Sequence, residues 1–561
     1  MAAPITQAQV LQQPFGPNVL VFTPGQDSAT QAAINRVYAG QEHAEFGNGR
    51  YAFLFAPGEY HVNVPVGFYT EVLGLGRMPD STHIVGDVHA DAALKNNNAT
   101  TTFWRAAENF SVTPTHGDTN GTLQWAVSQA VSFRRMHVLG DMVLHQKHGW
   151  ASGGWMSDTR VDGNVDSGSQ QQWISRNAEW RSWTGASWNM VFVGVNHPPA
   201  GEWPKPPYTR VTTVPVLREK PFLQWDGRVA WSVRVPALRH DTRGVSWADD
   251  AASGRSLPLR DFYVTQPGRD SAATMNAALQ RGKHLLLTPG TYELDAPLHV
   301  SRPRTVIMGL GFATLKPVHG TAAVQVDDVD GVSVSGVLFD AGEQESPALL
   351  EIGKPGVHRS HATDPIALFD VFFRVGGAAV GKVKACLVVN SDDTLIDDIW
   401  IWRADHGAGV GWTSNTSDNG LIVRGDRVTA YGLFVEHHQQ YQVLWSGNAG
   451  RTYFYQSEIP YDPPTQAAWT DPNGANGWAS YKVTAASHQA WGLGVYSVFR
   501  HPDVVLSRAI EVPRSPEVQL HHMMTTALDT LGAIENVVDD AGGPTQTKPR
   551  TTPEVAEFPT P

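Results

Sequence analysis

Short runs of β-branched and aromatic residues recur along the chain and alternate with turns rich in Gly, Asp and Asn. Representative runs are Trp188–Val195, Val332–Phe339 and Ile399–Trp402. Runs of this length between turn residues are typical of β-strands. The pattern therefore predicts an all-β protein.

Helical periodicity is confined mainly to two short stretches, residues 28–37 and 271–279. Each stretch follows an aspartate, and we expect Asp27 and Asp270 to cap the two helices. A short capping helix followed by many strands in small steps favours a right-handed parallel β-helix. The alternatives are a pair of sandwiches and a propeller, but the chain has no short-period blade motif.

The same strand-and-turn unit occurs twice in the chain. Its three parts recur in the same order: Pro24–Ala29, Ala56–Tyr60 and Val72–Gly76, then Pro267–Ala272, Thr288–Tyr292 and Ile307–Gly311. Three matched parts in one order indicate an internal repeat rather than a coincidence of common turns. We therefore expect two tandem right-handed parallel β-helix domains, each with a short N-terminal capping helix, and a binding cleft where they meet.

Composition suggests the domain boundaries. Residues 1–195 are expected to form the first β-helix domain, and residues 259–539 the second. Between them, residues 196–258 are rich in proline and predict an extended linker on the surface of both domains. Residues 540–561 are rich in Pro, Thr and Gly and lack an apolar pattern, which predicts a disordered tail.

The charge and the cysteine content exclude several classes of partner. Of the 561 residues, 42 are Lys or Arg and 54 are Asp or Glu, which gives a formal net charge of -12. Nucleic-acid binding needs clustered basic residues, and the sequence has no such cluster. No window approaches the roughly 20 apolar residues of a membrane span, so we expect neither nucleic acid nor a membrane as partner. The single cysteine, Cys386, excludes an intramolecular disulfide and a cysteine-based zinc site.

Tryptophans are concentrated in one part of the second half. Seven of the 19 lie between residues 400 and 500: Trp400, Trp402, Trp412, Trp445, Trp469, Trp478 and Trp491. The C–H faces of sugar rings pack on such flat side chains while the sugar hydroxyls reach polar neighbours. Core packing can account for some of these rings, and Trp402 and Trp445 are candidates for contact with a sugar.

Glu458 is the leading candidate for acid chemistry. Tyr455, Ile459, Pro460 and Tyr461 flank it and would remove part of its water. Desolvation disfavours the charged form of a carboxyl group, raises its pKa and leaves a proton available near neutral pH, as a general acid requires. The alternative interpretation is a strand end at the surface beside structural tyrosines.

Other polar candidates lie in both halves. Glu436 and Asp405 add two carboxylates upstream in short polar runs. In the first half, residues 149–158 and 167–173 combine small, polar and aromatic side chains and predict a hydrogen-bonding wall that includes Gln170. The alternative for these segments is a set of Ser, Asn and Gln ladders inside the turns of a β-helix.

Five segments resemble glycoside hydrolase family 55. The segment Tyr455–Asp462 resembles the general-acid motif of that family, and further likeness lies in Gln124–Gln129, Ser152–Gly154, Ser169–Trp173 and Trp188–Gly194. The likeness runs from about residue 15 to about residue 535 and includes the duplication. It implies a β-1,3-glucanase with two β-helix domains side by side. Such an enzyme hydrolyses laminarin-type glucan, usually from the non-reducing end, with inversion of the anomeric centre.

The resemblance also implies roles for single residues. Glu458 would be the general acid, while Ser157 and the main-chain carbonyl of Gln129 would position the attacking water from the first domain. An inverting enzyme keeps its acid and its water-activating group about 6.5 to 9.5 Å apart, which suits a cleft between domains. Glu436 is the candidate for a proton acceptor or for a group that tunes the pKa of Glu458. The expected substrate-binding residues are Gln170, Trp402, Asp405, Trp445, Tyr455 and Tyr461.

The resemblance further implies a secreted, extracellular and monomeric enzyme that acts on β-1,3-glucan and its oligosaccharides and uses no cofactor or metal. Two other classes remain as alternatives. A β-helix also carries pectin-type hydrolases and lyases, and Asp392, Asp393 and His406 faintly resemble the polygalacturonase pattern. A net-negative protein, however, suits a polyanionic substrate poorly. A non-catalytic glycan-binding protein would use the same tryptophans and would not need Glu458.

Overall fold

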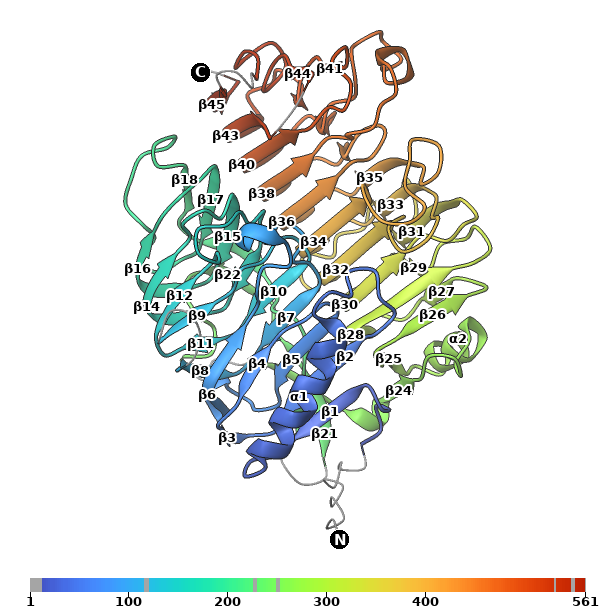
Figure 1. The fold of residues 1–561 in the computed structure, drawn as a ribbon. Coiled ribbons are helices and arrows are strands. Elements are labelled where there is room, and N and C mark those ends of the chain that lie inside the picture. Colours follow the sequence, from blue (N-terminus) through green and yellow to red (C-terminus); the bar gives the residue numbers. More distant parts are fainter. Residues whose placement is uncertain are drawn as a thin grey trace.

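The computed structural model describes residues 13–115, 121–225, 230–248, 253–528, 531–545 and 550–559. Most of the regular structure is β-strand, and most strands pair in parallel. Figure 1 shows two bodies of strands side by side, the first half of the chain in blue to teal and the second half in green to red. Among the described residues, no helix has the length and apolar character needed to cross a membrane.

In the first half, the chain passes back and forth between two sheets, so that each turn of chain stacks on the one before it. The sheet that faces the second half, called the inner sheet, has the order β1 (Val19–Phe22), β2 (Tyr51–Phe55), β5 (Thr70–Gly74), β7 (Arg105–Glu108), β10 (Val131–Arg134), β13 (Trp155–Ser157), β15 (Gln172–Arg176), β17 (Asn189–Val193) and β18 (Tyr208–Val211). The outer sheet has the order β3 (Gly58–Tyr60), β6 (Thr82–His89), β8 (Ser111–Pro114), β11 (His137–Val138), β14 (Arg160–Asp166), β12 (Asp141–Val143) and β9 (Thr122–Gln124), with β4 (Asn63–Pro65) beside β6 and β16 (Glu179–Thr184) beside β14.

The second half repeats this arrangement with longer strands. Its inner sheet has the order β24 (Phe262–Thr265), β25 (His284–Leu287), β28 (Val306–Pro317), β30 (Ser333–Asp340), β32 (Ala367–Val375), β34 (Leu395–Arg403), β36 (Thr429–Glu436), β38 (Gly450–Glu458), β40 (His488–Ser497), β43 (Val518–Ala527) and β45 (Glu554–Phe558), with β26 (Thr291–Leu294) beside β28. Its outer sheet has the order β27 (Leu298–Val300), β29 (Val324–Val326), β31 (Ser346–Ile352), β33 (Val383–Val389), β35 (Ser417–Val423), β37 (Val443–Trp445), β39 (Tyr481–Val483) and β42 (Ile510–Glu511).

Smaller elements connect and close these two bodies. Three small sheets consist of β19 (Val214–Leu217) with β22 (Arg239–Thr242), of β20 (Phe222–Trp225), β21 (Trp231–Pro236) and β23 (Gly254–Pro258), and of β41 (Val505–Leu506) with β44 (Ala533–Ile534). Short 3-10 helices are η1 (Pro79–Ser81), η2 (Lys95–Asn97), η3 (Leu259–Asp261) and η4 (Gln466–Ala468).

Columns of apolar side chains build the interior of the second half. Ile307, Val334, Leu368, Ile396 and Ala430 occupy equivalent positions on five neighbouring strands, and none is more than 1% exposed. Neighbouring strands lie about 4.8 Å apart, so each side chain packs directly on the next. Burying one Val, Leu or Ile side chain contributes about 1.5–3 kcal/mol, and this repeated packing explains why short apolar runs form stacked parallel strands.

A helix follows the first strand of each inner sheet. The two helices are α1 (Asp27–Gln41) and α2 (Ala272–Gln280). Met275 and Leu279 of α2 are buried in the core of the second half, where the helix covers the first turn of strands. The first helix packs likewise on β4. The sequence-based prediction of one short helix at the start of each half agrees with these positions.

The predicted capping roles of Asp27 and Asp270 are wrong. Asp27 is the first residue of α1, and no side-chain hydrogen bond caps that helix. Ser271 caps α2, because its side chain accepts a hydrogen bond from the backbone N–H of Thr274. The carboxylate of Asp270 instead accepts a hydrogen bond of 2.7 Å from the backbone N–H of Gln266 and so closes the turn before the helix.

The repeated sequence parts occupy equivalent places in the two halves. The first part forms the turn into a helix, the second joins β2 to β3 or β25 to β26, and the third lies at β5 or in β28. Gly58 and Gly290 have φ values of 140° and 150°, and a Cβ on either would lie within 2.5 Å of the Cγ of Pro24 or Pro267. The Pro-Gly pairs of the repeat are therefore a packing contact that each half makes in the same way.

The two inner sheets pack against each other through large apolar side chains. Trp155 and Ile174 of the first half lie in one buried cluster with Trp400, Phe434 and Tyr453 of the second half. Strand β17 of the first half contacts β38 and β40 of the second. Such a cluster resembles a domain core, and it holds the two halves in a fixed relative position.

A network of buried charges joins the halves beside this cluster. Arg134 of β10 forms ion pairs with Asp370 at 2.6 Å and with Asp397 at 2.9 Å. Lys220, which follows β19, pairs with Asp370 at 2.9 Å and with Glu108 at 2.7 Å. Burying a charge is unfavourable unless the charge is paired, so these contacts specify how one half sits on the other.

The expectation of an extended surface linker at residues 196–258 is wrong for the part that the structure describes. Strand β18 extends the inner sheet of the first half, and β19 to β23 form two antiparallel sheets. Trp225 and Val233 are buried in one cluster with Val19 and Leu286, between the first turns of the two halves. The prolines disfavour helices, but the apolar residues between them still form strands that fill this junction.

The expectation of a disordered tail at residues 540–561 is also wrong for its described part. Strand β45 pairs antiparallel with β43 at the last turn of the second half. Phe558 is only 4% exposed and packs in the core of that half, and Val555 packs against the same core. Residues 546–549 and 560–561 lie outside the described residues. Phe558 and Val555 hold this strand in place because they cover the apolar end of the strand stack. The composition of the segment does not show that this end needs to be covered.

Candidate active site

A cleft of about 430 Å³ opens where the strand ends of the two inner sheets meet. Its wall combines polar, acidic and aromatic side chains from both halves of the chain. The residues that line it are Thr100, Thr101, Phe103, Gln129, Trp150, Ser152, Gln171, Trp188, Trp402, Asp405, His406, Glu436, His437, Glu458, Tyr461, Leu528 and Arg550. Six of the ten residues predicted for the site are among them: Gln129, Trp402, Asp405, Glu436, Glu458 and Tyr461.

The two halves contribute side chains from opposite ends of their strands. Gln129 and Ser152 lie in the loops that lead into β10 and β13. Trp402, Glu436 and Glu458 lie at or next to the last residues of β34, β36 and β38. Strand starts of the first half therefore meet strand ends of the second half, which brings loops and strand ends of both sheets to one cleft.

Glu436 and Glu458 end neighbouring strands. Phe434 of β36 is paired with Gln456 of β38, and each glutamate lies two residues further along its strand. Neighbouring strands are about 4.8 Å apart, and side chains two residues on point to the same face. The register therefore places the two carboxyl groups side by side, where one negative charge disfavours the other.

Glu458 is half-buried in the wall of the cleft. Burial raises the pKa of its carboxyl group well above the ordinary value, and the charges of Glu436 and Asp405 raise it further. Its Oε2 atom accepts a hydrogen bond from the hydroxyl of Tyr461. A carboxyl group in this setting keeps its proton near neutral pH and can donate it to a bound molecule.

Three N–H groups hold the carboxylate of Glu436. The Nε2 atoms of Gln129 and Gln456 donate to Oε1 at 2.8 and 2.7 Å, and the Nε1 atom of Trp400 donates to Oε2 at 2.8 Å. Burial raises the pKa of Glu436 to about 7, although these hydrogen bonds lower it. Gln129 comes from the first half, so this carboxylate is fixed by donors from both sides of the cleft.

Asp405 brings a fixed negative charge to the same wall. It accepts a hydrogen bond of 2.8 Å from Nδ1 of His406, and its pKa falls to about 2 despite burial, because of that bond and the nearby histidines. Nε2 of His406 bonds to Glu45 of the first half at 2.6 Å, and the two carboxylates raise the pKa of His406 to about 10. Asp405 therefore stays ionised and helps to keep Glu458 protonated.

Ser152 lies across the cleft from the acidic residues, beside Gln129. Ser128 donates its hydroxyl proton to the carbonyl of Ala99 at 2.7 Å, and its oxygen accepts from the backbone N–H and from the hydroxyl of Ser152, both at 2.9 Å. The Ser152 hydroxyl thus uses its proton on Ser128, and no donor among the described residues bonds to its oxygen. A cleft-lining oxygen of this kind can accept a hydrogen bond from a water molecule.

The prediction of Ser157 as a cleft residue is wrong. Ser157 is fully buried between the two inner sheets, and its hydroxyl oxygen accepts a hydrogen bond of 3.0 Å from Nε1 of Trp155. It ends β13, whereas the cleft lies at the start of that strand. Ser152 is the serine that lines the cleft from this segment.

Three of the predicted substrate-binding residues do not line the cleft either. Trp445 is buried in the core of the second half, with its ring edge-on to His488, and Tyr455 lies in the same core. Gln170 is fully buried and holds two loops together, since its Oε1 accepts from the backbone N–H of Gly153 at 2.7 Å. Its neighbour Gln171 lines the cleft instead.

Sequence reasoning missed several cleft residues. Trp150 and Trp188 stack with ring centroids 6.0 Å apart, and Trp150 is 47% exposed. His437 is buried beside Glu458 and touches the ring of Tyr461. Trp150 lies in the polar and aromatic segment 149–158, and Trp188 begins one of the segments that resemble the family, but no pattern in the sequence marks His437.

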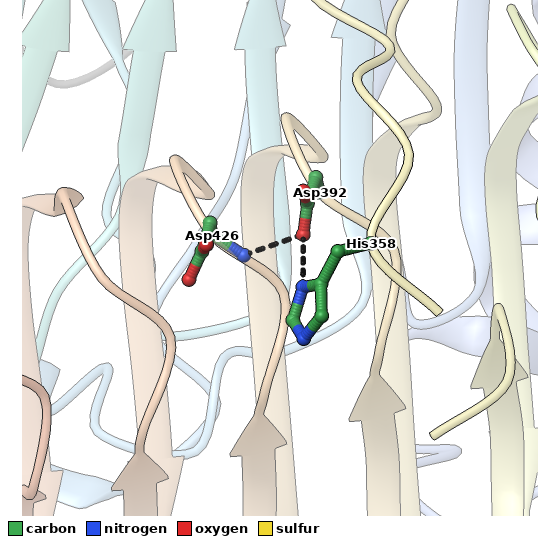
Figure 2. A group of neighbouring side chains, drawn as sticks. All are labelled: His358, Asp392 and Asp426. Atoms are coloured by element: carbon green, nitrogen blue, oxygen red, sulfur yellow. Dashed lines mark hydrogen bonds and ion pairs between the residues drawn. The ribbon is translucent and has the colours of Figure 1, made fainter. Parts of the chain in front are cut away.

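The paired aspartates Asp392 and Asp393 lie away from the cleft. Among the described residues, the one group of side chains with the spacing of a metal site is His358, Asp392 and Asp426 (Figure 2). Asp392 already accepts hydrogen bonds from the backbone N–H of Asp426 at 2.8 Å and from Arg427 at 3.2 Å. The group therefore ties neighbouring turns together, and His406 is not part of it.

Comparisons with known proteins agree over almost the whole chain. The model of the LAM55 pectate lyase-like domain matches residues 262–458. An exo-beta-1,3-glucanase of Streptomyces sp. (strain SirexAA-E / ActE) is 47% identical over 550 residues, which cover 97% of this chain and 90% of that protein. The structure of sacteLam55A from Streptomyces sp. SirexAA-E has a TM-score of 0.95 at 47% identity and covers 98% of this chain and 99% of that one. The structure of a variant of the same enzyme in complex with glucose has a TM-score of 0.95 at 46% identity. It covers 99% of this chain and 100% of the variant's chain.

These likenesses confirm the family that the sequence motifs indicated. Identity of this level over nearly the full length of both chains is far beyond a shared fold. The mostly β architecture with parallel sheets agrees with the pectate lyase-like β-helix of the family model. That model ends at Glu458, one of the acidic residues of the cleft. This chain belongs to glycoside hydrolase family 55.

Proposed function

We propose that this protein is an exo-β-1,3-glucanase that releases glucose from the non-reducing end of laminarin-type glucan with inversion of the anomeric centre. The similar Streptomyces protein is an exo-beta-1,3-glucanase, and a variant of it has been solved with glucose. The cleft of about 430 Å³ has the size of a small-molecule site and joins aromatic faces to polar groups, as sugar binding requires. Trp150, which is 47% exposed, and the half-buried Trp188 provide such faces.

The observation that carries the proposal is the environment of Glu458. Its carboxyl group lies in the wall of the cleft, and burial together with Glu436 and Asp405 raises its pKa. Hydrolysis of a glycosidic bond needs a proton on the leaving oxygen, and a carboxyl group that stays protonated near neutral pH supplies it. We assign Glu458 as the general acid, with the hydroxyl of Tyr461 fixing its Oε2 atom.

The first half supplies the site of the attacking water. We assign this role to Ser152 and Gln129, which line the cleft beside each other; the hydroxyl of Ser152 is within 3.3 Å of Oε1 of Gln129. Water held on this side approaches the anomeric carbon from the face opposite to Glu458, and the bond to the leaving oxygen breaks as the new bond forms. That geometry inverts the anomeric centre.

Glu436 has two roles in this scheme. Its charge favours the protonated form of Glu458. Its own pKa of about 7 suits a group that accepts the proton released by the attacking water. The three N–H donors keep the carboxylate in place while its charge changes.

The finer architecture and setting belong to the same proposal. Two right-handed parallel β-helices in tandem explain the repeated Pro-Gly contact and the opposite strand directions at the cleft. The large apolar interface lies between the halves of one chain, which supports a monomer as the active form. A polymeric glucan substrate supports action outside the cell.

The test is to incubate the protein with laminarin and, separately, with polygalacturonate and to follow the products by chromatography and by NMR of the anomeric proton. The proposal expects early release of α-glucose from laminarin alone. Early β-glucose would overturn inversion, and a ladder of oligosaccharides would overturn exo action. Products from polygalacturonate alone would favour the pectin-type alternative, whereas binding without any product would favour the glycan-binding alternative.

A further inference from the structure

A second cavity, of about 610 Å³, lies near the start of the two halves and shares no lining residue with the catalytic cleft. Its lining is polar and charged, and it combines Arg50 of the first half with residues of the second half that include Arg269, Ser271, Lys316, Asp340 and Arg374. The size is that of a small-molecule site. The proposed glucanase reaction gives no role to any of these side chains.

Arg50 is the unusual member of this lining. Its side chain is only 2% exposed and lies over the ring of Tyr69, with the guanidinium carbon 3.7 Å from the ring centroid. Its Nε donates to the hydroxyl of Thr314 at 3.1 Å, and its Nη1 donates to the carbonyl of Gly47 at 2.7 Å. Within the described part of the chain, Nη2 has no acceptor and no carboxylate lies within ion-pair distance. One N–H₂ group of a buried guanidinium in the cavity wall is therefore unused.

The carboxylates that line the cavity, Asp270, Glu293 and Asp340, form no ion pair with Arg50 within the described residues, although the charge of Asp340 favours the charged form of Arg50. Asp340 forms a bidentate pair with Arg374, with contacts of 2.8 and 2.7 Å. Asp270 pairs with Arg269 at 2.7 Å. Burial lowers the pKa of Arg50 to about 10, which still leaves it charged at neutral pH. A buried cation without a direct ion-pair partner is costly, and a bound anion would reduce that cost.

The start of α2 adds a second feature that favours an anion. Ser271, the N-cap of this helix, lines the same cavity. The first turn of a helix carries N–H groups without intrahelical partners and the positive end of the helix dipole. Anions are a common ligand of that position. Lys316, which is half-buried in the same wall, supplies a further positive charge.

We propose that this cavity binds an oxyanion, with Nη2 of Arg50 as its main donor and with the N-terminus of α2 and Lys316 as additional partners. The shared chemistry is a carboxylate or phosphate group, carried either by a free inorganic ion or by an anionic sugar. Arg50 belongs to the first half and the other partners to the second, so the bound anion joins the two halves. It would thus stabilise the folded protein without taking part in hydrolysis.

The experiment measures the melting temperature of the full protein in sodium phosphate, in sodium glucuronate and in sodium chloride at matched ionic strength. An anion concentration of about 100 times the dissociation constant should raise the melting temperature by about 2 °C relative to chloride. A rise in both phosphate and glucuronate would indicate that the oxyanion group is sufficient, and a rise in glucuronate alone would indicate an anionic sugar. No rise with either anion would overturn the proposal.

Two variants assign the effect to this cavity. Arg50→Gln should abolish the rise while laminarin hydrolysis continues, since Arg50 is outside the catalytic cleft. Lys316→Gln, at a half-buried position that should fold normally, is expected to weaken the apparent affinity by about tenfold, the effect of roughly 1.4 kcal/mol. An unchanged anion effect in Lys316→Gln and in any folded Arg50→Gln protein would contradict the assignment.

Discussion

Gln129 donates a hydrogen bond of 2.8 Å from its Nε2 atom to Oε1 of Glu436, and this bond crosses the boundary between the two halves of the chain. The two residues are 307 positions apart in the sequence. One belongs to the side of the cleft that holds Ser152, and the other lies beside Glu458. The bond therefore couples the proposed water site to the proposed acid, and neither half can form the site alone.

Replacing Glu458 by Gln should remove the proton donor while keeping the shape of the side chain. We expect kcat on laminarin to fall by about 10²- to 10⁴-fold, the usual contribution of general acid catalysis. Binding of laminarioligosaccharides should remain within a few-fold of the wild type, because the cleft keeps its aromatic faces. Glucose release and calorimetric titration measure the two quantities.

A substrate and a control sharpen that prediction. β-Glucosyl fluoride has a leaving group that needs no protonation, so the Glu458→Gln variant should lose much less activity on it than on laminarin. Glu351→Gln, on the outer strand β31, should retain wild-type activity on both substrates. Equal losses on laminarin and on the fluoride would count against Glu458 as the acid.

Replacing Glu436 by Gln should change the pH profile as well as the rate. Burial is the main cause of the raised pKa of Glu458, and the charge of Glu436 is the next. Without that charge the pKa of Glu458 falls, so the acid loses its proton at a lower pH. We expect the basic limb of the kcat profile to move towards lower pH and kcat itself to fall. A lower rate with an unmoved basic limb would contradict the proposed effect of Glu436 on the pKa of Glu458.

The sequence identified the acidic side of the cleft better than the water side. Glu458, Glu436 and Asp405 stand at strand ends in a distinctive aromatic context, and each lines the cleft. Ser152 and Ser157 lie in the same segment, and only the position of β13 decides which one faces the cleft. The boundaries of a three-residue strand depend on its partners in neighbouring turns, which local sequence does not contain.

That distinction gives a matched pair of variants. Ser152→Ala removes a cleft oxygen and should lower kcat on laminarin by about 10- to 100-fold, since one positioning contact is worth up to about 3 kcal/mol. Ser157→Ala should leave kcat near that of the wild type. It should instead lower the melting temperature, because the buried Nε1 of Trp155 loses its acceptor. A large loss of kcat in Ser157→Ala with a near-normal kcat in Ser152→Ala would instead support a catalytic role for Ser157.

The mostly β architecture with parallel sheets could be predicted, but the joining segments could not. Repeated Pro-Gly turns and short apolar runs correspond to the stacked strands, since each stacks on a similar neighbour. Trp225 in the connecting segment and Phe558 near the end are buried against residues far away in the sequence. Their burial depends on which apolar surface the two stacks leave uncovered, and only the assembled structure shows that surface.

The buried charges between the halves make stability depend on pH. Glu71 lies 3.5 Å from Lys220 and accepts a hydrogen bond of 2.7 Å from the backbone N–H of Gly311. Burial outweighs both contacts and raises the pKa of Glu71 from 4.5 to about 7. Between these two values the folded protein keeps a proton that the unfolded chain has released. The folded state therefore has more bound protons than the unfolded state in this window. The contribution of Glu71 to stability consequently falls as the pH rises through it.

Glu71→Gln isolates this contribution, because glutamine mimics the neutral form at every pH. The melting temperatures of the two proteins should differ least near pH 4.5. As the pH rises to about 7, the melting temperature of the variant should rise relative to that of the wild type. The slope cannot exceed about 1.4 kcal/mol per pH unit for one proton. Titration of the buried histidines affects both proteins alike and cancels in the difference. A difference that stays constant between these pH values would show that Glu71 is ionised in the folded protein and that Lys220 outweighs its burial.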